Sequence, residues 1–276
     1  MTSPKRKRMF STRAVDMWIG AAARARPLLC SIGSTDPTGV AGVTRDLVIY
    51  ERLGAWGVFA LAAVTAQNRR RVTEVHPLPA RVLRDQLDSV MHGPRPAALR
   101  IGLLPDARLI AAVARFLRAQ RKGIPVVLDP VISSSSGHRF LGPAELGALE
   151  GLLPLVTLVT PNASEAQALT GIRVRTVADA ERAAMRLRER GCAALVTGGH
   201  LRGPQIVDVL ADAKGTVRFR AARIASQMRG TGCTLAAATA VGLAKGRALR
   251  RAIADGRAFV RAELKAQRRA RGKGRS

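Results

Sequence analysis

Short apolar segments alternate with helical segments along this chain, and that alternation limits the possible fold more than any other feature. Apolar runs of strand length lie at residues 28–32, 57–66, 100–104, 124–128, 155–159 and 193–196. Segments with helical spacing lie between or beside them, at residues 40–54, 81–91, 107–121, 144–152 and 177–190. Strands separated by helices favour a parallel sheet that helices cover on both faces. We therefore expect an α/β fold with three α/β/α layers around a mostly parallel central sheet.

The composition agrees with such a core. The 276 residues are 47% hydrophobic and 3% aromatic, so Ala, Val and Leu must fill the interior, as in helices packed on a parallel sheet. No apolar run reaches the roughly 18 residues that span a bilayer. Cys30, Cys192 and Cys233 show neither metal-ligand spacing nor an even set for disulfides. We expect a protein of the reducing cytoplasm without a membrane partner.

Positive charge is concentrated at the two ends. The net charge is +27, and roughly half of the excess lies near Lys5–Arg8 and Arg268–Arg275. We predict a disordered basic extension at residues 1–26, one domain at 27–265 and a basic tail at 266–276. Binding of single-stranded nucleic acid usually requires aromatic side chains interleaved with the basic ones, and aromatic side chains do not interleave with the arginines of this chain. Nucleic acid is therefore not expected as a partner, beyond weak polyanion binding by the basic ends.

The segment Gly230-Thr231-Gly232-Cys233-Thr234 precedes a small apolar helical run. Glycines allow a tight turn and close approach to a ligand. A turn that feeds the start of a helix also presents free N–H groups, which favour an anion and a thiolate. The segment thus predicts a phosphate-binding turn with Cys233 as an activated thiol. A glycine-capped helix that carries a buried cysteine is the alternative.

Polar residues follow several predicted strands, and the carboxyl ends of parallel strands share one crevice. These residues are Asp36, Asp46, Gln67, Asn68, Asp129, Asn162 and Glu165. An amide such as Gln67 can pair with the edge of a heterocycle, and carboxylates such as Asp129 and Glu165 can hold Mg²⁺. Each has a structural alternative: Asn162 and Glu165 form a capping box, and Asp36, Gln67 and Asp129 suit turns and loops.

Together these residues resemble the hydroxymethylpyrimidine/phosphomethylpyrimidine kinases of thiamine biosynthesis, in the ribokinase-like superfamily, whose close relatives include pyridoxal kinases. The resemblance covers about residues 28 to 262. It rests on motifs that occur in order, at residues 34–42, 64–68, 101–104, 128–131, 160–165, 198–200 and 230–234. It implies the ribokinase-like form of the α/β/α fold, with ATP and Mg²⁺ as cofactors. It also implies phosphorylation of the hydroxymethyl group of an aminopyrimidine and of its monophosphate, by a homodimer.

The resemblance also assigns roles to residues. Cys233 would be the general base, beside an anion hole made by the backbone of Gly230, Thr231 and Gly232. Gln67 would bind the pyrimidine edge, in a pocket lined by Asp46, Ser34, Ala41, Thr65, Leu103 and Val131. The nucleotide would contact Asn162, Thr197, Gly199 and Arg229, and Mg²⁺ would contact Asp129 and Glu165.

Several positions depart from the family pattern, among them two that would contact phosphate. Thr197 stands where the family usually has lysine, and Arg229 stands where it usually has histidine. Arginine binds phosphate well, so Arg229 or Arg69 could replace the lost cation. The alternatives are a pyridoxal-type kinase and a non-catalytic, ligand-sensing or polyanion-binding protein on the same scaffold.

Overall fold

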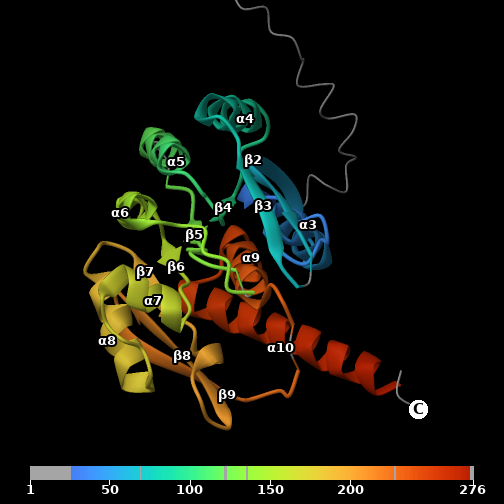
Figure 1. The fold of residues 1–276 in the computed structure, drawn as a ribbon, viewed down its shortest axis with the longest axis vertical. Coiled ribbons are helices and arrows are strands. Elements are labelled where there is room, and N and C mark those ends of the chain that lie inside the picture. The colour runs from blue at the N-terminus through green and yellow to red at the C-terminus, as the bar shows by residue number, and fades with distance from the viewer. Residues whose placement is uncertain (1–25, 69, 121–122, 135, 227, 274–276) are drawn as a thin grey trace, which may run out of the picture.

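The nine strands among the described residues form one sheet (Figure 1). The computed structural model describes residues 26–68, 70–120, 123–134, 136–226 and 228–273, so the predicted extension at 1–26 lies almost wholly outside this part, as does Arg69. The strand order is β3-β2-β1-β4-β5-β6-β7-β8-β9. Six strands are parallel: β1 (Leu28–Ser34), β2 (Trp56–Gln67), β4 (Ala98–Ile101), β5 (Val126–Leu128), β6 (Leu158–Val159) and β7 (Ala193–Val196). Antiparallel strands complete both edges: β3 (Val72–Pro77), β8 (Gln205–Asp212) and β9 (Gly215–Ala222).

Helices cover both faces of the sheet, as Figure 1 shows, which confirms the predicted α/β/α layers. One layer contains α4 (Ala80–His92), α5 (Ala107–Ala119), α6 (Pro143–Glu150), α7 (Ala163–Thr170) and α8 (Val177–Arg188). The opposite layer contains α3 (Gly42–Arg52), α9 (Thr231–Ala244) and α10 (Leu249–Lys273). Two short 3-10 turns are η1 (Leu153–Leu155) and η2 (Gly198–His200). No helix in the described part of the chain is both long enough and apolar enough to cross a bilayer.

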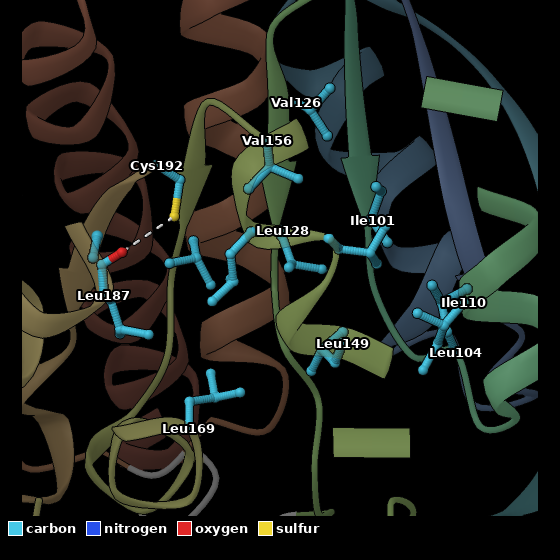
Figure 2. Packing of buried hydrophobic residues seen from close by; sticks show 14 of the residues in the cluster. Ile101, Leu104, Ile110, Val126, Leu128, Leu149, Val156, Leu169, Leu187 and Cys192 are labelled. Atoms are coloured by element: carbon cyan, nitrogen blue, oxygen red, sulfur yellow. Dashed lines mark hydrogen bonds between the residues drawn. The ribbon is translucent and has the colours of Figure 1, made fainter. Parts of the chain in front are cut away.

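Alternate side chains of the parallel strands enter two separate cores. Along β5, Val126 and Leu128 join the core under α4 to α8, whereas Val127 joins the core under α3, α9 and α10. This alternation follows from the two-residue period of a strand whose faces are both covered. Figure 2 shows the first core, in which Leu128 and Ile101 lie among side chains from the helices. Cys30 and Cys192 are buried in it as well, as expected.

Several elements differ from the sequence prediction. The strand expected at 100–104 is β4, which ends at Ile101, so Leu103 and Leu104 lie in the loop that follows. β3 was not predicted, because its polar edge residues Glu74 and His76 resemble loop polarity. The segment predicted as a basic tail at 266–276 is helical as far as Lys273, since α10 continues through it.

Glu263 connects α10 to α3. Its carboxylate accepts hydrogen bonds from Arg52 at 2.6 and 2.7 Å and from Arg45 at 3.1 Å. The hydrogen bonds from Arg52, together with those from Arg45, hold the pKa of Glu263 below its usual value. A carboxyl whose pKa is lower in the folded state stabilises the fold above its unfolded pKa, and this contribution disappears as the pH falls through the folded pKa.

We expect Glu263→Gln to lower the free energy of unfolding by about 1 kcal/mol at pH 7, the upper range for a partly exposed pair. The difference from the wild type should shrink as the pH falls below about 4.3, the unfolded pKa of Glu, because the unfolded state then binds a proton that the folded state, with its lower pKa, still resists. Urea unfolding of the variant and the wild type at pH 7 and pH 3.5 measures this difference in the free energy of unfolding. Glu51→Gln is the control, because Glu51 contacts the exposed Arg26. Equal losses for Glu263→Gln at both pH values would contradict the prediction.

Candidate active site

The predicted site residues gather where the parallel strands end. Gln67 closes β2, Asp129 follows β5, and Asn162 follows β6. The segment Thr197–His200 follows β7, and an isolated bridge joins Thr197 to Asn162. The carboxyl ends of parallel strands lie at one edge of a sheet, so this arrangement confirms the predicted common edge.

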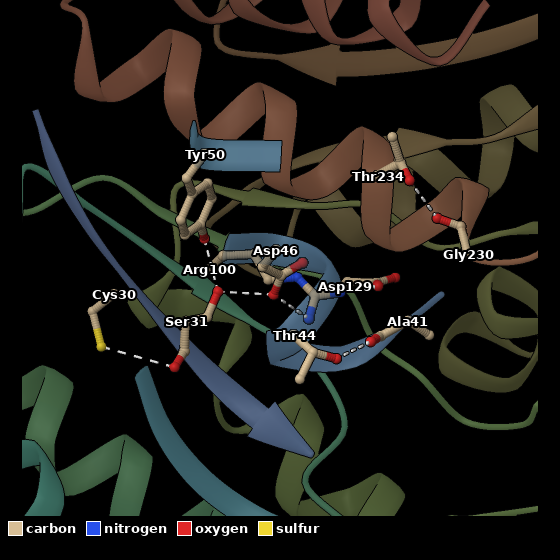
Figure 3. Close-up of polar contacts among 10 residues, drawn as sticks. All are labelled: Cys30, Ser31, Ala41, Thr44, Asp46, Tyr50, Arg100, Asp129, Gly230 and Thr234. Atoms are coloured by element: carbon tan, nitrogen blue, oxygen red, sulfur yellow. Dashed lines mark hydrogen bonds and ion pairs between the residues drawn. The ribbon is translucent and has the colours of Figure 1, made fainter. Parts of the chain in front are cut away.

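The turn at Gly230 brings the start of α9 to this edge. Gly230 has φ of +73°, and a Cβ there would lie 2.1 Å from the carbonyl oxygen of Val40. Glycine is therefore required both by the backbone conformation and by the contact with the first loop. Its own carbonyl accepts bonds of 2.8 Å from the amide and hydroxyl of Thr234 (Figure 3). Glycine offers no side chain to cap the helix, so the amides of Thr231, Gly232 and Cys233 remain suited to an anion.

A buried guanidinium lies behind this turn. Arg100 of β4 is 1% exposed, and its Nη1 lies 3.2 Å from Oδ2 of Asp46, while its Nη2 pairs with Oδ2 of Asp129 (Figure 3). Burial opposes the charged form, but the carboxylates of Asp46 and Asp129 outweigh it and raise the pKa of Arg100. Arg100 was not predicted as a site residue, because in the sequence it is the first residue of an apolar run that predicts a strand. The signal was present: a lone charge in a strand buried on both faces needs a partner.

Asp46, which was predicted to line the substrate pocket, lies inside the protein beside Arg100. Its side chain has no exposed surface and contacts Arg100 and the hydroxyl of Ser31, which donates to Oδ2 at 2.8 Å. Burial raises the pKa of Asp46 to about 6, although Arg100 and Ser31 act in the opposite direction. Asp46 therefore supports Arg100 from within the protein, and its role in the substrate pocket stays a prediction.

Cys233 lies at the predicted place, but its acidity differs from the expectation. Burial, followed by the negative charge of Asp129, raises the pKa of Cys233 to about 12, and Asp129 also forms a hydrogen bond with the thiol. The expected lowering by the helix start is thus outweighed by burial and by the neighbouring carboxylate. A thiol with a raised pKa can act as a base only if it passes its own proton to another group, and Asp129 is the neighbouring acceptor.

Asn162 and Glu165 form the capping box that the sequence offered as an alternative. Asn162 Oδ1 accepts from the amides of Ser164 and Glu165 at 2.9 and 3.1 Å, and Glu165 Oε2 accepts from the amide of Asn162 at 2.8 Å. Burial and the nearby charge of Asp129 raise the pKa of Glu165 to about 8. Two neighbouring carboxylates that repel each other are a donor set that suits a divalent cation.

The loop after β7 is fixed from below by residues that the sequence did not indicate. The amide of Gly198 donates to Oδ1 of Asp208 at 2.7 Å, and Arg257 of α10 donates to Oδ2 of Asp208 at 2.6 Å. Arg223 of the segment after β9 donates to the carbonyl oxygens of Gly199 at 2.8 Å and Gly203 at 3.0 Å. These contacts hold Thr197 and Gly199 at the edge of the sheet.

The predicted pyrimidine residues lie beside the first loop. Gln67 is half-buried, and its Nε2 donates to the hydroxyl of Thr65 at 3.1 Å, which in turn donates to the carbonyl of Thr35 at 2.7 Å. Arg229 donates to the carbonyl of Asn68 at 2.6 Å and so connects the β2 loop with the Gly230 turn. The other predicted lining residues are buried or half-buried: Ser34, Ala41, Leu103 and Val131.

A groove of about 220 Å³ opens next to these loops. The first loop contributes Val40, the segment before the glycine turn contributes Met228 and Arg229, and α10 contributes Glu263 and Gln267. The first loop itself is held by Asp36, whose Oδ1 accepts from the amide and hydroxyl of Thr38 at 2.9 and 2.8 Å. The turn predicted at Asp36 is therefore present in the structure.

An amide-lined turn, a thiol and two neighbouring carboxylates at the carboxyl edge of an α/β/α sheet define a site of the phosphotransferase class. The sequence model of the phosphomethylpyrimidine kinase family matches residues 36–275, and the chain belongs to this family. The hydroxymethylpyrimidine/phosphomethylpyrimidine kinase of Rhizobium meliloti is 40% identical over 240 residues, which are 86% of this chain and 90% of that protein. The protein of the same name from Streptomyces coelicolor is 38% identical over 85% of this chain and 87% of its own.

Solved structures show the same architecture. The phosphomethylpyrimidine kinase of Clostridium difficile has a TM-score of 0.76 at 28% identity and covers 87% of this chain and 100% of its own. The pyridoxal kinase of Staphylococcus aureus in complex with AMP-PCP has a TM-score of 0.78 at 28% identity and covers 87% of this chain and 88% of its own. The predicted ribokinase-like fold and the kinase class are thus confirmed.

We expect Gly230→Ala to destabilise the protein by more than the roughly 1 kcal/mol that a left-handed backbone costs a non-glycine residue. The added methyl group would overlap the carbonyl of Val40, so one of the two loops must move. Gly246→Ala is the matched control, because Gly246 has the same φ of +73° and open space around its Cβ position. Thermal unfolding of both variants measures the difference. Equal destabilisation by Gly230→Ala and Gly246→Ala would show that the close contact with Val40 does not contribute to the cost.

Proposed function

We propose that this protein transfers the γ-phosphoryl group of ATP to the hydroxymethyl group of 4-amino-5-hydroxymethyl-2-methylpyrimidine, and to the phosphate of the resulting monophosphate, in thiamine diphosphate biosynthesis. The observation that carries the proposal is the meeting of the Gly230 turn with Asp129 at the carboxyl edge of the sheet. Gly232 and Cys233 of that turn lie beside Asp129: a Cβ on Gly232 would lie 3.7 Å from Asp129 Oδ1, and the thiol of Cys233 forms a hydrogen bond with the same carboxylate.

The backbone amides of the Gly230 turn would stabilise charge on the transferring phosphoryl group. Preformed N–H donors at a helix start need no reorganisation when charge develops on oxygen. Gln67 would hold the aminopyrimidine through its amide, which can both donate and accept. As the bond to phosphorus forms, the sulfur of Cys233 would take the proton of the substrate hydroxyl while the thiol passes its own proton to the hydrogen-bonded Asp129 carboxylate, which is the final proton acceptor.

The carboxylates of Asp129 and Glu165 fit Mg²⁺. Magnesium in such sites is bound by one or two carboxylates together with phosphates and waters, so a larger protein cage is not needed. When bound, Mg²⁺ would neutralise charge on the nucleotide phosphates. Thr197, Gly199 and Arg229 would contact the nucleotide, with Asn162 holding Glu165 in place through the capping box.

Pyridoxal is the second candidate substrate. The pyridoxal kinase of Staphylococcus aureus is as similar in fold as the pyrimidine kinase of Clostridium difficile, with TM-scores of 0.79 and 0.76. The pyrimidine is preferred because the family model and the relatives that are 38 to 40% identical carry that name. Thr197 in place of lysine is the observation that favours a non-catalytic, ligand-binding role. The homodimer, the cytoplasmic location and weak polyanion binding by the basic ends remain predictions.

The test is direct. Purified protein is incubated with ATP, Mg²⁺ and one of three alcohols: hydroxymethylpyrimidine, its monophosphate or pyridoxal. We expect phosphorylated product from both pyrimidines, and less from pyridoxal. Turnover of pyridoxal alone would replace the proposed substrate, and the absence of product from all three would reject the kinase function.

Cys233→Ala should lower kcat for the pyrimidine about 100-fold, the lower range for the loss of a general base, with little change in the KM of the pyrimidine. Cys192→Ala is the control, because Cys192 is a buried cysteine next to the amino end of β7, at the opposite edge of the sheet. It should retain the kcat of the wild type. A kcat near the wild-type value for Cys233→Ala would remove Cys233 from the proton transfer.

A further inference from the structure

Arg100 lies at a place in the sheet where an apolar residue is expected. It is paired in register with Ser31 of β1 and Val127 of β5, and its side chain lies on the face covered by α3 and α9. Its neighbours Leu99 and Ile101 enter the opposite core. A charge in the centre of such a sheet costs free energy unless it is fully paired, and a well-packed apolar side chain would often be at least as stable. Its presence therefore calls for an explanation other than stability.

The guanidinium joins two carboxylates that come from different elements. Asp46 belongs to α3, and Asp129 follows β5. Asp46 is fixed in turn by the hydroxyl of Ser31, which lies 2.8 Å from the hydroxyl of Tyr50 (Figure 3). Because Arg100 is planar and carries several donors, it can hold both carboxylates in one geometry.

The chain makes room for this arrangement. A Cβ on Gly102 would lie 2.1 Å from Nη1 of Arg100, so the guanidinium occupies the space that a side chain would take there. The pairing is also incomplete, since Oδ1 of Asp46 and Nε of Arg100 are buried without a hydrogen-bond partner in the structure. The contact between Arg100 and Oδ2 of Asp129, by contrast, is made. The cluster thus keeps the contact with Asp129 while it leaves two buried polar atoms unpaired, which costs stability.

We propose that Arg100 is a positioning residue for phosphoryl transfer, which holds Oδ2 of Asp129 so that Oδ1 faces the Gly232–Cys233 turn. The inference rests on the proposed kinase function and deepens it. Asp129 is 5% exposed, so its orientation is decided by its protein neighbours. Arg100 supplies the contact on one side of the carboxylate, and the glycine turn lies on the other. A carboxylate that rotates away from the reacting groups no longer contributes to the transition state.

Three variants test this role. Arg100→Met combined with Asp46→Asn removes the guanidinium and one of the two charges that it would leave unpaired, and it keeps Asp129. Arg100→Lys keeps the positive charge, but it has a point charge in place of a fork. Arg250→Met is the control, because Arg250 forms a two-point pair of 2.8 and 2.8 Å with Asp212, at the end of β8 that lies beside the amino end of β7.

We expect kcat of the double variant to fall about 100-fold with the KM of the pyrimidine within about threefold of the wild type, as for a misplaced catalytic group. Arg100→Lys should lose about tenfold in kcat and thus recover part of the loss. Arg250→Met should keep the kcat of the wild type, even where its melting temperature falls. Circular dichroism and thermal unfolding establish that each variant is folded.

A folded double variant with kcat within threefold of the wild type would overturn the inference. If the double variant does not fold, Arg100→Lys decides, because a wild-type kcat with lysine would show that the fork is not needed. An equal fall in kcat for Arg250→Met would also overturn it, since any ion pair would then suffice. If the wild type phosphorylates none of the alcohols, the proposed function fails and the inference falls with it. An active wild type with fully active variants rejects the inference alone.

Discussion

Parallel pairing of six strands is the constraint on which the rest of this molecule depends. Parallel strands need crossover connections, so each of these six strands is followed by a segment that begins at the same edge of the sheet. That edge collects Gln67, Asp129, Asn162 and Thr197 without any of them being near another in the sequence. The helices then bury both faces, which leaves this edge as the place where polar groups from six connections meet.

Because helices bury both faces of the sheet, the polar groups that lie against the sheet are shielded from solvent, and this determines their chemistry. Asp46, Asp129 and Glu165 are at most 6% exposed, so solvent screens the charges beside them only weakly. Arg100 is the cation that accompanies Asp46 and Asp129. Phosphotransfer chemistry needs concentrated charge of this kind, and a low-dielectric layer behind the site makes each charge more effective.

The sequence predicted the layers and the common edge because these follow from patterns of short range. A strand-end motif such as Leu128-Asp129-Pro130 can be read locally, and the alternation of strands with helices orders such motifs in space. The capping box at Asn162 was likewise visible, because it depends on two residues three positions apart.

What the sequence did not reveal depends on contacts between distant segments. Arg100 and Asp46 are far apart in the chain, so neither predicts the other, and the strand pattern hid the arginine. Asp208, which holds the amide of Gly198, could not be distinguished from a surface aspartate. The predicted lowering of the Cys233 pKa was wrong for a related reason. The helix start is a local feature of the sequence, whereas the burial and the Asp129 carboxylate that raise this pKa come from distant segments.

The turn that completes the site is made near the end of the chain, although it contacts the first loop at Val40. During synthesis, the segments that form the central strands and α4 to α8 leave the ribosome before residue 230 does. The opposite face of the sheet waits for α9 and α10, which supply much of its core. A nascent or truncated chain therefore exposes an apolar sheet face and has no anion-binding turn. Catalytic competence and protection from aggregation are acquired in the same late step.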